Sequence, residues 1–545
     1  MMRGNFDNTG RLVRFMLRRE RIISAVWIVI LVLFSMAIAP GMSDMFDAEA
    51  RKNFAASYDN PVMIAMMGPV YGADNYTSGA MYSGMMLLWV ILAVAAMNVF
   101  LVVRHTRADE EKGRAEVIRS LPTGRLSILN AVMITAVIVN TILALLTGLA
   151  IAATNVPSMD FAGSMLYGLV LGVSGLVFAA LAAVFCQLSS GRSGAAGLSF
   201  LVLGIAYMIR AAGDMYSMNG LSCISPLGLA QRSQVYVENH LWPTVILLVE
   251  AIVLTAVAYK LNSIRDTDQG FIPTRPGRKE ANAGLLSSFG LSLRLLRNTM
   301  LTWLIVMLLL GASYGSILGN IYDFVGDSPD YMLILGVPKT LVDTLSPAEM
   351  GGMVSKYFGV FVASMMSLVC LIPLLIAMMK PRNEEKDGRT EHILSRVVTR
   401  TEYLAGYAVI SFAASVILQC ATAIGLYGAA SASGLNPFSL GELIKANLAY
   451  VPAQWTMISV AILLIGIAPK SAGAVWGYFG FVFFASFMGE VIGLPEWLMG
   501  LSPMKYIPRI PFAELTFAPL AILTAIAAVL AVAGFIFYQK RDVTA

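Results

Sequence analysis

The sequence predicts an all-α polytopic membrane protein with about twelve transmembrane helices, arranged as two parallel six-helix repeats. Three observations carry this prediction: the composition, the number of long apolar runs, and the similarity between the two halves of the chain. Of the 545 residues, 57% are hydrophobic and 13% are charged, and the mean hydropathy is +0.73. Soluble domains contain about 25% charged residues, so most of this chain must meet lipid.

Twelve apolar runs are long enough to cross a bilayer. A hydrocarbon core about 30 Å thick needs about 20 apolar residues in a helix. Runs of this length begin near residues 22, 79, 126, 161, 193, 241, 299, 355, 403, 446, 474 and 519. An even number of spans places both termini on one side, and 29 of the 38 Lys and Arg residues fall on that side. The positive-inside rule then predicts that both termini are cytoplasmic.

The basic N-terminus and the first apolar run together imitate a secretory signal. Residues 294–318 repeat the same arrangement in mid-chain, where a cleavage site has no purpose, so we expect a retained first span.

The two halves match at a nearly constant offset of 275–277 residues. The matching positions are Trp27 with Trp303, Arg18 and Arg21 with Arg294 and Arg297, Arg125 with Arg400, Asp214 with Glu490, Ser225-Pro226 with Ser502-Pro503, and Arg265-Asp266 with Arg541-Asp542. Six spans per repeat give both halves the same orientation, which implies a pseudo-two-fold axis along the membrane normal and a pathway between the halves. We therefore expect a first half at 1–265, a cytoplasmic linker at 266–290 and a second half at 291–545.

Enzyme chemistry finds little support in the sequence. The chain has no Gly-Lys dipeptide and hence no phosphate-binding loop of the form GxxxxGK[ST]. His105, His240 and His392 lie far apart, and the four cysteines show no metal-ligand spacing. The one GxSxG match, at 311–315, lies inside an apolar span, so we interpret it as helix packing, like the Gly pair at 168 and 172. We expect no metal and no cofactor in this chain. The basic residues lie in short segments between spans, which argues against nucleic acid.

The strongest polar pattern lies in the loops at 104–125 and 380–402. Each contains an acidic cluster followed by Gly-Arg-x-Glu. The residues concerned are Glu110, Gly113, Arg114 and Glu116, and in the second half Glu385, Gly388, Arg389 and Glu391. On one helix, Glu110 and Arg114 share a face at i, i+4 spacing, as do Glu385 and Arg389, which predicts a rigid charged knob for docking a partner. The alternative is a solvated loop with internal ion pairs.

Four further residues are candidates for a transport pathway or gate: Glu250, Arg210, Asp214 and Glu490. Glu250 falls near the middle of the sixth span, where an isolated acid is costly. It is either a protonated acid bonded to a neighbouring helix, a charged group lining a wet pathway, or an acid reached by Arg210. Ser486 stands in the second half where Arg210 stands in the first, so any role of the Arg-Asp pair is asymmetric.

The chain resembles the type-2 family of ATP-binding-cassette (ABC) export permeases, in the fused double-length form described as exporters of polyketide antibiotics such as tetronasin. The residues that carry the resemblance, over nearly the whole chain, are Glu110-x-x-Gly113-Arg114-x-Glu116 and its copy, Arg192, Gly197, Leu203-Gly204, Arg210-Ala-x-Gly213-Asp214, Ser225-Pro226-Leu227-Gly228, Trp242-Pro243, Arg265-Asp266, Pro273-x-Arg-Pro276-Gly277 and Trp303.

The resemblance implies a permease of a prokaryotic plasma membrane that extrudes hydrophobic or amphiphilic small molecules, such as antibiotics. It implies an interfacial helix at the N-terminus, although a simple basic flank explains residues 11–21 equally well. It also implies a coupling helix between spans two and three, and short extracellular helices between spans five and six. Two copies of a separate ABC ATPase would bind ATP and magnesium below the membrane. The alternatives are a proton-driven secondary multidrug transporter and a membrane scaffold that transports nothing.

Overall fold

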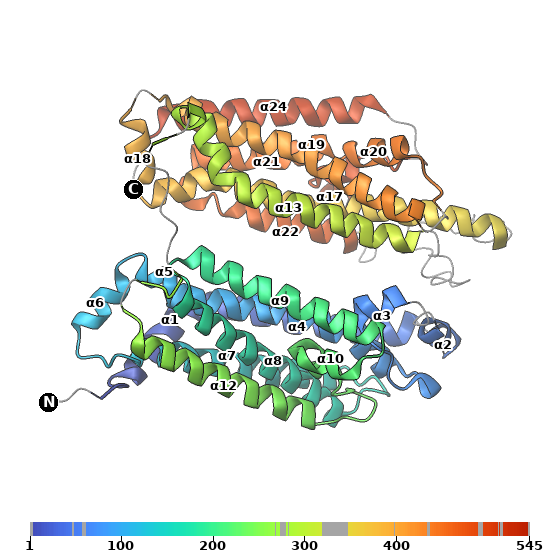
Figure 1. Cartoon of the computed structure of the whole chain (residues 1–545). Coiled ribbons are helices and arrows are strands. Elements are labelled where there is room, and N and C mark those ends of the chain that lie inside the picture. Colours follow the sequence, from blue (N-terminus) through green and yellow to red (C-terminus); the bar gives the residue numbers. More distant parts are fainter. Residues whose placement is uncertain are drawn as a thin grey trace. The chain divides into compact units, whose positions relative to one another are not determined.

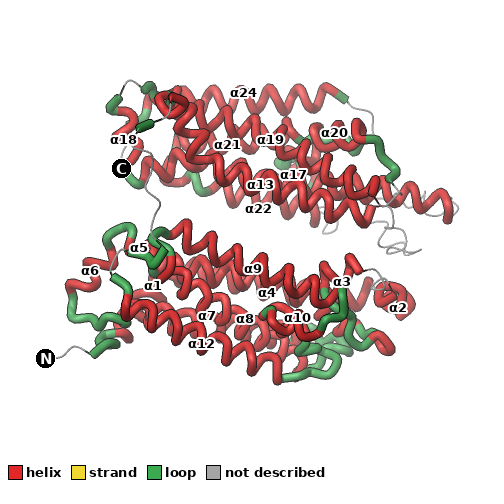
Figure 2. Tube along the Cα trace, viewed as in Figure 1, coloured by secondary structure: helices red, strands yellow, loops and turns green. Residues whose placement is uncertain are grey.

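The computed structural model describes residues 4–45, 48–56, 61–266, 269–272, 280–281, 283–318, 347–396, 398–432, 436–488, 494–510, 512 and 516–542. These residues form helices joined by loops, with no strand among them and one isolated bridge between Ser189 and Ile272 (Figure 2). The chain divides into two compact units, Met1–Pro276 and Gly277–Ala545. The predicted all-α membrane fold is confirmed.

Six long helices build the first unit (Figure 1). They are α1 (Thr9–Met45), α4 (Ser78–His105), α7 (Ser127–Ala152), α8 (Phe161–Leu188), α9 (Arg192–Met215) and α12 (Trp242–Ile264). Side-chain caps fix two of the starts: Thr77 accepts a hydrogen bond from the backbone N–H of Ala80, and Asp160 accepts one from that of Gly163.

The second unit repeats this order. Its long helices are α13 (Ser288–Leu318), α17 (Pro347–Lys386), α19 (Arg400–Ala432), the pair α20 (Leu440–Leu448) and α21 (Val451–Ile467), α22 (Ala474–Met488) and α24 (Phe517–Lys540). The helix corresponding to α8 is divided into α20 and α21, and Pro452 lies in the first turn of α21. Proline lacks the N–H that an unbroken helix would need there.

Eleven helices in the described part of the chain are long and apolar enough to span a membrane. Each falls on one of the twelve predicted spans. The remaining predicted span, near residue 474, corresponds to α22, whose apolar stretch Ala474–Ser486 is shorter than a bilayer requires, and residues 489–493 beyond it lie outside the described ranges.

Helix α8 lies at the centre of the first unit, in contact with α4, α7, α9 and α12. Gly168 and Gly172 allow this packing: a Cβ at Gly168 would lie 2.1 Å from the carbonyl oxygen of Ala144 in α7, and one at Gly172 would lie 2.9 Å from that of Asn140. The predicted close helix contact is confirmed.

The GxSxG match on α13 is also a packing surface. A Cβ at Gly311 would lie 2.4 Å from the carbonyl oxygen of Thr422, and one at Gly315 would lie 2.3 Å from that of Leu426, both on α19. In the first unit the corresponding helices, α1 and α7, pack together in the same way. The contact between the first and third spans therefore occurs in both units, as duplication requires.

One expectation about the N-terminus is wrong. The basic stretch from Arg11 to Arg21 is no separate interfacial helix, because α1 runs without a break from Thr9 to Met45. The basic residues simply extend the first span, and residues 294–297 do the same within α13.

Short helices complete both units. Between the first two spans lie α2 (Ala48–Ala56), α3 (Pro61–Met67) and η2 (Ala73–Asn75). Between the fifth and sixth spans lie α10 (Asn219–Ile224) and α11 (Pro226–Gln231), and in the second unit α23 (Glu496–Met499) and η5 (Pro503–Tyr506). Short helices at this place agree with the resemblance. The turn η3 (Ala283–Leu286) precedes α13, and η4 (Pro469–Ser471) precedes α22.

Candidate functional site

The loop after the second span folds as a helical hairpin in the first unit. Helix α5 (Arg107–Glu110) ends, the chain turns through Gly113, and α6 (Arg114–Ser120) begins. Gly113 has φ of 67°, and Gly388 of the second unit has φ of 72° before α18 (Arg389–Leu394). Residues with a side chain rarely adopt this left-handed backbone conformation, which explains why both repeats have glycine at this position.

The predicted ion pair between Glu110 and Arg114 does not form. The turn at Gly113 interrupts the helix, so the i, i+4 rule does not apply across it. Arg114 lies instead 3.3 Å from Asp109, and Arg389 lies 3.2 Å from Glu384 at the equivalent place.

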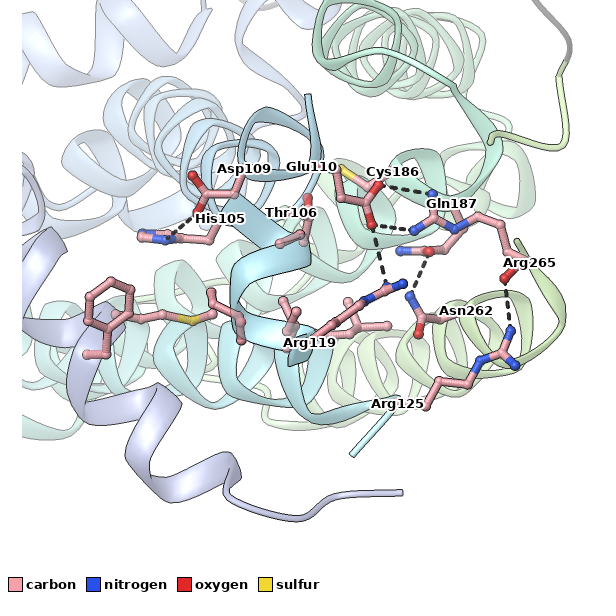
Figure 3. A pocket seen from close by; sticks show the side chains of 16 residues that line it. His105, Thr106, Asp109, Glu110, Arg119, Arg125, Cys186, Gln187, Asn262 and Arg265 are labelled. Carbon is pink, nitrogen blue, oxygen red and sulfur yellow. Dashed lines mark hydrogen bonds and ion pairs between the residues drawn. The ribbon is translucent and has the colours of Figure 1, made fainter. Parts of the chain in front are cut away.

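Glu110 and Glu385 each bind an arginine at the end of the sixth span. Arg265 donates two hydrogen bonds to the Glu110 carboxylate, at 2.6 and 3.1 Å (Figure 3). Arg541 donates two to Glu385, both at 2.5 Å. In each pair both side chains are largely buried. These pairs close each six-helix unit by joining its second span to its sixth.

A third arginine repeats at the start of the third span. Arg125 donates to the carbonyl oxygen of Arg265 at 2.9 Å, and Arg400 donates to that of Arg541 at 2.5 Å. The two units therefore share a complete polar network, which fixes the base of each hairpin.

The opposite side of the hairpins is open to solvent. Glu116 and Arg114 are exposed on α6, and Glu391 and Arg389 are exposed on α18. Val117 is 68% exposed, which is unusual for an apolar side chain beside so many charges. The sequence motif thus separates into an inward half, which holds the fold, and an outward half, which is free to meet a partner.

A buried acid–histidine cluster lies behind the first hairpin, and sequence reasoning missed it. Glu20 of α1 and His105 of α4 are both buried, with His105 Nε2 2.8 Å from Glu20 Oε1. Arg104 also donates to Glu20, at 2.8 Å, and Arg19 donates two hydrogen bonds to Asp109. Glu20 is the single acid among the basic residues 11–21, and that contrast is the pattern that could have revealed it.

The side chain of Arg210 binds backbone carbonyl groups in the structure. Its guanidinium is fully buried and donates to the carbonyl oxygens of Ile64, Ala65 and Met66, at 3.3, 2.8 and 3.4 Å. These are terminal carbonyls of α3, which carry partial negative charge, and that of Ile64 also accepts from the backbone N–H of Gly68 at 2.8 Å. The side-chain amide of Gln231 donates a hydrogen bond to the next carbonyl oxygen, that of Met67.

Asp214 lies one turn further along α9, with Oδ2 3.6 Å from Arg210 Nη1. The structure thus brings the predicted Arg210–Asp214 pair together. Burial raises the pKa of the nearby Tyr71 phenol to about 12, so this tyrosine stays neutral. Glu490, the predicted counterpart of Asp214, lies outside the described residues.

Glu250 stands on α12 in a half-buried position. Among the described residues it has no hydrogen bond or ion pair, and Arg210 is not its partner, so the third explanation offered from the sequence finds no support. Ile526 occupies the equivalent place in the second unit and is 43% exposed. In the described ranges no group of three or more His, Cys, Asp or Glu side chains could hold a metal ion.

Comparison with known proteins agrees with this architecture. The family model described as "Multidrug efflux system permease Rv1217c, C-terminal domain" matches residues 11–260 and 285–539, which correspond to the two six-helix units. The multidrug efflux system permease protein Rv1217c of Mycobacterium tuberculosis is 32% identical over 545 residues, covering 99% of this chain and 96% of that protein. Two polar hairpins on duplicated membrane bundles, matched along their whole length, show that this chain belongs to the Rv1217c family of multidrug efflux system permeases.

Proposed function

We propose that this chain is the membrane-spanning subunit of an ATP-driven ABC exporter, and that a separate ATPase supplies the energy. The observation that carries the proposal is the repeated hairpin, anchored on its inner side by Glu110 or Glu385 and exposed on its outer side. A loop that only linked two spans would need no such anchoring in both repeats.

Two equivalent hairpins call for two copies of the ATPase. Each copy would dock on α6 or α18 and bind ATP and magnesium itself, since the sequence of this chain contains no phosphate-binding loop. The rigid connection from hairpin to the sixth span, through Arg265 or Arg541, gives movement of the ATPase a direct route into the bundle.

The substrates we propose are hydrophobic or amphiphilic compounds, including antibiotics, taken from or through the membrane. The chain's 32 methionines suit surfaces that accommodate irregular apolar ligands. We also propose that both termini and both hairpins are cytoplasmic, because the basic residues gather on that side.

Purification of the chain with a candidate ABC ATPase from the same cells would test this proposal. We expect the chain alone to hydrolyse no ATP, and native mass to show one permease with two ATPase subunits. ATP hydrolysis by the chain alone would overturn the proposal of a separate ATPase. Substrate efflux driven by a proton gradient without any ATPase would favour the secondary-transporter alternative. A complex showing neither stimulated hydrolysis nor efflux would favour a scaffold.

A further inference from the structure

A polar cavity of about 450 Å³ opens beside the first hairpin, between the N-terminal segment, the loop from α6 to α7 and the end of α12. Three of its lining side chains are arginines: Arg119, Arg125 and Arg265. Asn262 lies in the same wall, and Figure 3 shows these four residues around a narrower inner pocket that they also line.

Positive charge exceeds negative charge around this cavity. Glu110 is shared by Arg265, by Arg107 at 2.7 Å and by Arg119 at 3.9 Å. Arg125 donates to a backbone carbonyl, which neutralises no charge. Asp266 is the one acid on the wall of the outer cavity. On the wall of the outer cavity, three guanidinium groups thus face one carboxylate.

One arginine of the cavity has unused hydrogen-bonding capacity, as does its counterpart Arg541 in the second unit. The side chain of Arg265 is 4% exposed, and its Nε has no hydrogen-bond partner in the described part of the chain. A buried N–H without an acceptor is unfavourable, and a bound anion would satisfy it.

The second unit provides an internal comparison, because it keeps the network but changes the cavity residues. Leu394 stands where Arg119 stands in the first unit, and Tyr538 stands where Asn262 stands. The Tyr538 ring is fully buried and lies 4.8 Å from the Arg541 guanidinium. An aromatic ring therefore occupies the side of Arg541 that corresponds to the cavity side of Arg265.

We propose that the cavity of the first unit binds a phosphate group, and that the headgroup of an acidic phospholipid supplies it. Guanidinium groups match the oxygen geometry of phosphate and form charge-assisted hydrogen bonds with it. The cavity lies at the end of the membrane-spanning helix α12, where basic pockets between transmembrane helices bind acidic headgroups. A soluble phosphate offers the same chemistry, and the experiment below separates the two sources. The proposal does not depend on the ATPase.

The test uses the purified full-length chain, stripped of lipid and held in micelles of a non-ionic, phosphate-free detergent, with phosphatidylglycerol or inorganic phosphate added. Retained lipid is measured by native mass spectrometry and stability by the midpoint of thermal unfolding. Arg119→Leu and Asn262→Tyr convert the site to the residues of the second unit. Arg14→Leu, on the exposed face of α1 at the same end of the unit, is the control that removes equal charge outside the cavity.

We expect phosphatidylglycerol to stabilise the parent and Arg14→Leu. Binding should weaken about tenfold or more in Arg119→Leu, which removes a guanidinium that would donate to the phosphate, and in Asn262→Tyr, where the ring would fill the space beside Arg265. Stabilisation of the parent by inorganic phosphate alone would retain the phosphate site but overturn the lipid as its source. Equal retention of phosphatidylglycerol by the parent and both cavity variants would overturn the proposal, as would equal loss in Arg14→Leu. Should Asn262→Tyr fail to fold in the detergent, Arg119→Leu decides the outcome.

Discussion

At the scale of single residues, Arg210 shows how a polar group deep in a membrane protein can serve the backbone. The sequence suggested a pathway or gate for it, with a role that differs between the halves because Ser486 stands at the equivalent position. The structure adds three carbonyl contacts at the end of α3, and these could not have been foreseen, since nothing in residues 61–67 marks them as needing a donor.

Replacing Arg210 should therefore unfold the region around α3. Arg210→Met leaves the carbonyls and Asp214 without a buried donor, and we expect a loss of about 3–5 kcal/mol in the free energy of unfolding. Arg192→Met is the matched control, because Arg192 begins the same helix in a solvent-exposed ion pair with Glu111, worth at most about 1 kcal/mol. Thermal unfolding of the purified variants measures both. Equal stability of the two variants would show that the Arg210 contacts contribute nothing.

Glu250 poses the opposite problem, a membrane acid with no partner in the described residues. We expect Glu250→Gln and Glu250→Leu both to lose efflux while keeping stability, because a charged group lining a wet pathway cannot be replaced by either. Efflux by the complex of permease and ATPase, with its unfolding temperature, gives the answer. If Glu250→Gln preserves both efflux and stability and Glu250→Leu lowers only stability, the side chain serves packing through a hydrogen bond and has no role in transport.

At the scale of elements, the two charged loops were recognised from sequence as a repeated motif, but their internal pairing was not. The sequence shows that Gly113 and Glu116 are repeated in register in the second half. It does not show the partner of Glu110, because Arg265 lies 155 residues away. Arg265 and Arg541 had nevertheless been identified as repeated positions, and a repeated acid together with a repeated base is the pattern that could have joined them.

The exposed acids and the buried acids of each hairpin therefore have different roles, so their variants should have different effects. Charge reversal at the exposed positions, Glu116→Lys with Glu391→Lys, should weaken ATPase docking and leave the permease stable. Glu110→Gln or Glu385→Gln should instead destabilise the permease by about 3–5 kcal/mol, because each leaves a buried guanidinium without its acid.

Co-purification of the ATPase and thermal unfolding distinguish the two effects, and Arg396→Glu, an exposed charge reversal outside α18, is the control. If the exposed double variant binds ATPase and transports as the parent does, α6 and α18 are only solvated surfaces.

At the scale of the whole molecule, the spans were predicted well because length and hydropathy are local properties. The division of one helix into α20 and α21 was missed, although Pro452 marks it. The short helix α3 is held by hydrogen bonds from Arg210, which is far away in the sequence, so no local sequence pattern predicts its position.

Topology gives a test of the whole arrangement. In a variant without native cysteines, we expect cysteines at Asp7 and Asp542 to resist an impermeant thiol reagent added outside intact cells. A cysteine at Glu238, in the exposed loop before α12, should react. Reaction at only one terminus would contradict an even number of spans, and reaction at both would invert the orientation.

The two closing ion pairs have a consequence for how such a chain assembles. During synthesis, a duplicated protein risks exchanging equivalent helices between its halves, and Arg265 and Arg541 cannot prevent this because either could bind either acid. Their neighbours can. Asn262, which donates to Gln187 at 2.9 Å, would leave a void in the place of Tyr538, and the tyrosine ring would not fit the place of the asparagine without displacing its surroundings. The identical pairs hold each half together, and the unlike residues beside them ensure that each sixth helix returns to its own half.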